Sequence, residues 1–380
     1  MVTYGDVEKL LAIHGDESPV LSLYLEIPLD QQELRELPAR ASDLIAAAHG
    51  APAGPGADQV LAPARQQVRG ILETRARDWA GHCAAIFAWP ATGQAEAMKV
   101  PAGTGERAVL APKPHIRPLL VAAQRHPAYQ VVVVDRRHAW LFSVSGDQVQ
   151  LVAQPTAPGV PSAGYGGWYG LESYNVNERV AGLAHQHFED SAELLDKTMR
   201  HVPGEVFVVG GHAATIPQFL ATLGHGTRDR FAGSFAVDTA TMTPAKIRAL
   251  ADPVIATWVR NTEAELVDLI RTQPPGGLAA VGIPQCLAAI RNHAIRTLAL
   301  PAETLVPGLA CRACGALGTT RGEFTRKIGC GHGRQAVIDV PDVIDEMTMA
   351  AIADGGRAEA VADPPGGIAA LLRFPMPRRG

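Results

Sequence analysis

Apolar residues along the chain fall into short runs that predict β-strands, and these runs alternate with longer segments whose apolar positions recur at helical spacing. The strands are expected at residues 20–27, 83–89, 129–135, 139–145, 148–154, 205–211, 297–300, 358–361 and 368–374. The helices are expected at residues 6–14, 34–48, 58–80, 116–124, 171–200, 244–271 and 341–355. Strands and helices that alternate in this way predict an α/β (α+β) fold.

Proline- and glycine-rich breaks divide this pattern. A PKP tripeptide at 112–114 separates the first α/β segment from the next, and PPGG at 274–277 interrupts the last one. A chain of 380 residues is too long for one core, because domains usually hold roughly 100 to 200 residues. We therefore expect three domains: residues 1–112, 113–240 and 241–380.

The composition of the chain indicates which kinds of partner to expect. The formal net charge is −4 and 47% of the residues are hydrophobic, which predicts a folded chain without a global attraction to nucleic acid. DNA is therefore not an expected partner, and RNA contacts would need local patches. Neither a basic, apolar leader nor a run of 18 uncharged apolar residues is found, so we expect no membrane partner and a cytoplasmic location.

Three of the five cysteines form a motif typical of zinc sites. Cys311 and Cys314 are two residues apart and a glycine follows them, while Cys330 and His332 offer a second pair. We predict that these four side chains hold a structural zinc ion in a small insert at about 308–336. The alternative is that the thiols are free or redox-active. Cys83 and Cys286 lie in apolar runs and are expected in the core.

The same insert is locally basic. Between residues 312 and 334 the sequence has five cationic residues and one carboxylate, Glu323. They are Arg312, Arg321, Arg326, Lys327 and Arg334. This cationic rim is a candidate surface for RNA phosphates, and a solvated charged face is the other interpretation.

A glycine-rich segment at 161–170, PSAGYGGWYG, leads directly into the long helix predicted at 171–200. By itself it is typical of a flexible loop before an amphipathic helix. Together with VVVVDRRHAWLFSV at 131–144, EVFVVGG at 205–211, the cysteine insert and the ending at 343–374, it resembles the bacterial branch of the archaeo-eukaryotic release-factor family. That family is related to class-one release factors, to Pelota and to the Balon-type hibernation factors.

The resemblance implies a middle RNase H-like domain that carries the loop and a C-terminal release-factor/Pelota-like domain that carries the zinc insert. It also implies binding to the ribosomal A site, with rRNA and tRNA as contacts and elongation factor Tu as a possible delivering GTPase. Tyr165, Trp168 and Arg179 are then candidate RNA contacts beside the cationic rim. The expected role is ribosome hibernation or rescue during stress.

Trp168 departs from the family pattern, because it follows Gly166 and Gly167 where release factors carry a catalytic glutamine. An indole has one hydrogen-bond donor and no acceptor, so it cannot place a water as a glutamine side chain does. We therefore expect no classical hydrolysis and no catalytic side chain. Backbone amides of Gly166 and Gly167 leave a peptidyl-tRNA hydrolase open as the alternative. A stress-related RNA- or protein-binding protein is a further one.

Two more polar sets have simpler interpretations. Asp135, Arg136, Arg137 and His138 form a polar hairpin tip, since no partner carboxylates for a nuclease site are evident. His185 and His187 are two residues apart and so cannot share a helical face, which predicts solvated histidines.

Overall fold

The computed structural model describes residues 6–7, 9–10, 19–51, 57–156, 170–202, 205–274, 276–324, 330, 332 and 334–376. The chain divides into two compact units. Residues 1–125 and 262–380 form the first, and residues 126–261 form the second.

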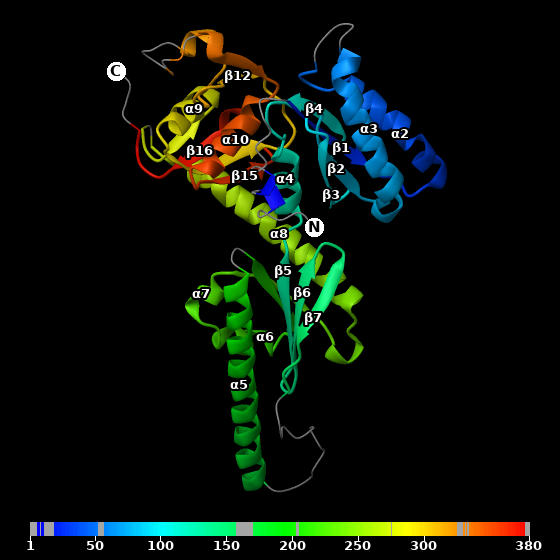
Figure 1. Cartoon of the computed structure of the whole chain (residues 1–380). Coiled ribbons are helices and arrows are strands. Elements are labelled where there is room, and N and C mark those ends of the chain that lie inside the picture. Colours follow the sequence, from blue (N-terminus) through cyan, green and yellow to red (C-terminus); the bar gives the residue numbers. More distant parts are fainter. Residues whose placement is uncertain are drawn as a thin grey trace. The chain divides into compact units, whose positions relative to one another are not determined.

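The first unit begins with an antiparallel sheet of order β3-β2-β1-β4. Its strands are β1 (Val20–Glu26), β2 (Cys83–Trp89), β3 (Gln94–Val100) and β4 (Arg107–Ala111). Successive side chains of β1 point to opposite faces. Leu21, Leu23 and Leu25 pack against α2 (Gln31–Ala46) and α3 (Ala57–Arg75), which lie beside the sheet in Figure 1.

The other face of this sheet belongs to a core that the C-terminal third completes. Tyr24 and Phe87 share one buried cluster with Leu298 and Met347. The C-terminal sheet has the order β10-β16-β11-β15. Its strands and the helices near it are β10 (Ala279–Val281), β11 (Ile295–Pro301), β15 (Arg357–Val361), β16 (Ala369–Leu372), α4 (Arg117–Arg125), α9 (Ile283–Arg291) and α10 (Val343–Ala353). The two ends of the chain therefore form one hydrophobic core.

A small sheet of order β13-β12-β14 carries the cysteine insert. Its strands are β12 (Gly308–Cys311), β13 (Leu317–Gly318) and β14 (Val337–Val340). The side chains of Leu309, Phe324 and Val337 form a separate, small core together with Cys311. The opposite face of this sheet contributes Ala310, Leu317 and Val340 to the large core of the first unit, so the face with Cys311 is the part that a metal ion would help to fold.

The second unit is a five-stranded sheet of order β7-β6-β5-β8-β9 with a helical layer on each face. Its elements are β5 (Tyr129–Val134), β6 (Ala139–Ser145), β7 (Gln148–Ala153), α5 (Gly170–His201), β8 (Val206–Gly211), α6 (Ile216–Ala221), α7 (His225–Arg228) and β9 (Phe231–Ala236). Strands β5, β8 and β9 are parallel, and β6 and β7 extend them as an antiparallel meander. Val132 and Val134 pack with α5 and α6, whereas Val131 and Val133 pack with the first part of α8 (Pro244–Arg271).

The mixed α/β class with several sheets is confirmed. The expected division into three domains stays a prediction. His187 corrects the sequence interpretation: it is only 3% exposed and lies beside Phe188, while His185 is exposed on α5. No helix in the described part of the chain is long and apolar enough to cross a membrane.

Candidate functional site

The four predicted zinc ligands converge. One donor atom from each of Cys311, Cys314, Cys330 and His332 lies within 4.8 Å of the others. A tetrahedral zinc ion with Zn–S bonds of about 2.3 Å needs its sulfurs about 3.8 Å apart, so the spacing fits such an ion. The group can hold a metal such as zinc.

Backbone hydrogen bonds of the knuckle explain why the sulfurs converge. Cys311 ends β12, its amide donates to the Ala316 carbonyl over 2.8 Å, and its carbonyl accepts from Gly315 N over 2.8 Å. Gly315 has φ +70°, a conformation that glycine adopts without strain. The glycine after Cys314 thus closes the turn that brings both thiols to one side.

The pKa values of Cys314 and Cys311 are shifted in opposite directions. Burial raises the pKa of Cys314 to about 11, and hydrogen bonds to the Cys330 and Cys311 sulfurs add to this. Burial opposes ionisation of Cys311 as well, but the hydrogen bonds from Cys330 and from the Cys314 and Ala313 backbone lower the pKa of Cys311. A divalent cation would supply the positive charge that two or more thiolates here require.

The cationic rim around this group is only partly described. Arg312 is exposed, whereas Arg321 pairs with Asp339 at 3.2 Å, so its charge is locally balanced. The side chain of Arg334, and both Arg326 and Lys327, lie outside the described residues. The role of the rim in RNA binding stays a prediction.

A second convergent group, which the sequence did not reveal, lies deep in the first unit. His115, Asp342 and Asp345 each offer a donor atom within 4.8 Å of the other two, and all three are buried. Asp342 is the N-cap of α10 and accepts from Ile344 N at 3.2 Å. Asp345 accepts from Arg117 N at 2.8 Å.

This group has its own cation. The Arg117 guanidinium is fully buried, and its Nη2 lies 2.7 Å from Asp342 Oδ2. His115 Nδ1 lies 3.4 Å from Asp345 Oδ1. Burial works against ionisation of Asp345, but His115 and Arg117 outweigh it and lower its pKa. We therefore interpret this group, termed the buried ion cluster, as an internal ion pair set and not as a metal site.

Lys113 extends the buried ion cluster toward solvent. Its Nζ lies 2.8 Å from Glu346 Oε2, and the Glu346 side chain is only 6% exposed. Burial raises the pKa of Glu346, and Lys113 opposes this shift. The segment 113–117, which follows the N-terminal sheet, is thus bound to the first two turns of α10.

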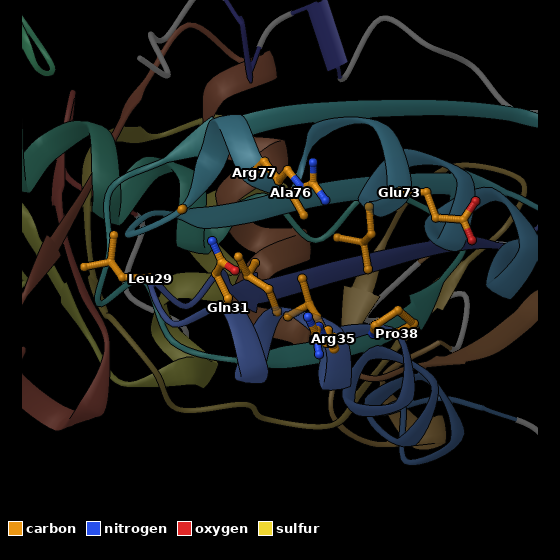
Figure 2. Close-up of a pocket in the computed structure, with 11 residues that line it drawn as sticks. Leu29, Gln31, Arg35, Pro38, Glu73, Ala76 and Arg77 are labelled. Carbon is orange, nitrogen blue, oxygen red and sulfur yellow. The ribbon is translucent and has the colours of Figure 1, made fainter.

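A groove of about 700 Å³ lies between α2 and the end of α3 (Figure 2). Its walls are mainly aliphatic, with Leu34, Leu37 and Leu72 among the lining residues, and Arg35 and Arg77 are exposed at its rim. The groove lacks converging nucleophiles or carboxylates, which suits binding better than catalysis.

The predicted loop residues Tyr165, Gly166, Gly167 and Trp168 lie outside the described residues, and so does the side chain of Arg179. Their roles stay predictions. The two core cysteines are confirmed, since Cys83 and Cys286 are fully buried.

The middle of the chain matches a known protein family. Residues 114–256 match the model of bacterial archaeo-eukaryotic release factor family 10. No curated protein matches the sequence.

Among solved structures, similar folds include Pelota of Archaeoglobus fulgidus, with 14% identity, coverage of 78% of this chain and 81% of that chain, and a TM-score of 0.32. Archaeal Pelota in a model of its ribosome-bound state with ABCE1 has 16% identity, coverage of 99% and 95%, and a TM-score of 0.41. Dom34 of S. cerevisiae has 9% identity, coverage of 78% and 82%, and a TM-score of 0.38. These TM-scores are below 0.5, so the likeness is loose. The resemblance predicted from the sequence is confirmed over residues 114–256, where the chain is similar to bacterial archaeo-eukaryotic release factor family 10.

Proposed function

We propose that this protein is a translation factor of the release-factor and Pelota kind that binds the ribosomal A site in the cytoplasm and protects idle or stalled ribosomes. The match of residues 114–256 to a release-factor family carries this proposal. The matched segment contains the whole meander β5–β7, the start of α8 and the glycine-rich segment between β7 and α5. The part of the chain that resembles the family therefore includes the residues that would reach the ribosome.

Binding without classical hydrolysis is the second part of the proposal. Trp168 stands in the position of the catalytic glutamine, and its ring can stack on an exposed nucleobase for about 1 to 3 kcal/mol. Tyr165, Arg179 and the cationic rim are further proposed contacts. Zinc bound by Cys311, Cys314, Cys330 and His332 would have a structural role, since four protein ligands leave no open position for a reacting water.

Co-sedimentation with vacant bacterial ribosomes tests the proposal. We expect stoichiometric binding that weakens from 50 to 200 mM salt, and roughly tenfold weaker binding for Trp168→Ala, which loses the stacking energy. Phe374→Ala is the control, because it removes an aromatic ring that is 45% exposed and lies outside the glycine-rich segment. Absence of wild-type binding at every salt concentration would refute A-site binding.

A peptidyl-tRNA hydrolysis assay separates hibernation from the enzymatic alternative. We expect no ester cleavage above the rate of ribosomes alone. Cleavage that is lost in Gly166→Ala/Gly167→Ala would instead establish a hydrolase that uses the backbone amides of the loop. Delivery by elongation factor Tu with GTP is tested by adding it to the same binding reaction.

A further inference from the structure

The turn between β5 and β6 presents two adjacent cations on a rigid support. Asp135 Oδ1 accepts hydrogen bonds from Arg137 N at 2.7 Å and from His138 N at 2.8 Å, and Asp135 N donates to the His138 carbonyl at 2.9 Å. Thr239 Oγ1 donates to the second carboxylate oxygen at 3.1 Å. One oxygen of Asp135 therefore stabilises the turn itself, and the other holds the turn to Thr239.

The two guanidinium groups of this turn have no such structural role. Arg136 and Arg137 are exposed, and neither side chain forms an ion pair or hydrogen bond with any part of the chain that the structure describes. Two other surface cations of this unit are ion-paired, by contrast: Lys197 lies 2.7 Å from Glu193, and Arg200 lies 3.5 Å from Asp196. The charge of the turn is thus available to an external anion.

Aromatic groups lie directly beside these cations. The rings of His138 and Trp140 are 5.4 Å apart at an interplanar angle of 30°, and both side chains are partly exposed. Two free guanidinium groups next to a partly exposed pair of rings suit an RNA strand, whose phosphates accept paired hydrogen bonds and whose bases stack.

The turn is also hydrogen-bonded to the residues that follow β7 and precede the glycine-rich segment. Ala139 N donates to the Pro155 carbonyl at 3.0 Å, and His138 forms an isolated antiparallel bridge with Thr156. Residues 155 and 156 are the last ones described before that segment. A partner that contacts residues 155 and 156 would therefore also contact the turn.

We propose that the β5–β6 turn is an RNA-binding site in which Arg136 and Arg137 bind backbone phosphates and the His138–Trp140 pair contacts a base. The inference rests on the proposed function, for which it names the contacting chemistry. It differs from the predicted rim of the cysteine insert, since it lies in the other compact unit.

The salt dependence of binding tests this site. Each phosphate contact contributes about 0.7 to 0.9 to the slope of log affinity against log salt. Between 50 and 200 mM salt, wild-type affinity for vacant ribosomes should therefore fall about tenfold more than that of Arg136→Ala/Arg137→Ala. The Lys variant pair, Arg136→Lys/Arg137→Lys, should keep the wild-type slope, because it keeps both charges.

Lys197→Ala/Arg200→Ala is the matched control, because it also removes two cations from the same unit. The turn itself survives in the alanine variant, since Asp135 binds backbone amides and not the arginine side chains. A slope for Arg136→Ala/Arg137→Ala equal to that of this control would overturn the proposal.

A second probe separates this inference from the proposed function. Fluorescence anisotropy with a poly(U) RNA of about 30 nucleotides reports phosphate binding without a ribosome. Binding to poly(U) that weakens in Arg136→Ala/Arg137→Ala supports the turn as an RNA site even where ribosomes are not bound. Absence of wild-type binding to both probes would overturn the turn and the ribosomal role together.

Discussion

The cysteine group and the buried ion cluster both bring together several potential metal ligands, but only the buried ion cluster contains a cationic side chain. Each brings at least three potential metal ligands within 4.8 Å, and both lie in the first compact unit. The cysteine group has exposed members and no cation in contact with its sulfurs among the described residues, whereas the buried ion cluster contains Arg117 at 2.7 Å from Asp342. Convergence of donors is therefore insufficient evidence for a metal site. A metal ion is expected where the protein supplies no cation of its own, and an internal ion pair is expected where it does.

Loss of the metal should have the largest effect. Cys311→Ser removes a buried ligand, and structural zinc supplies about 10 to 16 kcal/mol of apparent binding energy to small domains at pH 7. We expect the purified variant to lose its bound zinc and the insert to become sensitive to protease, as measured by elemental analysis and limited proteolysis. Cys83→Ala should keep its zinc, since that thiol lies in a separate core. A variant Cys311→Ser that retains stoichiometric zinc would contradict the ligand set.

Removal of the Arg117 side chain should have the second-largest effect. Arg117→Ala removes the cation nearest to the buried Asp342, and breaking a buried ion pair in this way costs about 3 to 5 kcal/mol of unfolding free energy. Urea denaturation followed by circular dichroism measures this loss. An exposed ion-paired arginine, Arg69, offers the control, because Arg69→Ala should cost about 1 kcal/mol or less. Equal losses in the two variants would mean that the buried ion cluster does not stabilise the fold.

The number of metal ions bound per chain also distinguishes the cysteine group from the buried ion cluster. Because Arg117 already supplies a positive charge inside the buried ion cluster, the wild-type protein should hold one zinc ion per chain and not two. Elemental analysis after dialysis gives this ratio directly. A second tightly bound ion that disappears in Asp345→Asn would show that the buried ion cluster is a metal site after all.

The outermost pair of the buried ion cluster should give the smallest effect, and one that depends on pH. Lys113→Ala removes the partner that opposes the raised pKa of Glu346, at a cost of about 1 kcal/mol near pH 7 because Lys113 is half exposed. A carboxyl whose folded pKa exceeds its unfolded value of about 4.5 binds more protons in the folded state, so stability falls as pH rises through that pKa. The deficit of Lys113→Ala should therefore shrink on acidification from pH 7 toward 5.

Glu346→Gln in the Lys113→Ala background provides the control. The double variant has no ionisable group at position 346. It should therefore be more stable than Lys113→Ala near pH 7, where Glu346 is ionised, and equally stable at low pH, where Glu346 is protonated. A deficit of Lys113→Ala that is the same at pH 5 and pH 7 would show that the lysine acts by packing alone.

The sequence predicted those features that depend on neighbouring residues. Strands with dense β-branched or aromatic runs, such as Tyr129–Val134, were predicted almost to the residue. The edge strand Gln94–Val100 was missed because only one of its residues is fully buried and its sequence, QAEAMKV, carries little β-branched or aromatic signal. Likewise the convergence of Cys311, Cys314, Cys330 and His332 was predicted because they lie within one short segment, and their spacing is visible in the chain.

The buried ion cluster was missed for the opposite reason. Arg117 and Asp345 are 228 positions apart, and nothing local marks either as buried. Arginine and aspartate are usually exposed, so their pairing follows only from the tertiary contact between the segment 113–117 and α10. The glycine-rich segment and its family resemblance were visible in the sequence, but the roles of its residues await the binding experiments.

The discontinuity of the first unit matters for how the protein is made. Tyr24 and Phe87 emerge early from the translating ribosome, yet Leu298 and Met347, with which they share a core, are synthesised much later. At about 5 to 20 residues per second, the roughly 260 residues between Phe87 and Met347 take about 13 to 50 seconds to synthesise. During that interval one face of the N-terminal sheet stays uncovered, so nascent-chain chaperones have an apolar surface to bind, and the middle unit, residues 126–261, is completed before the sheet is covered.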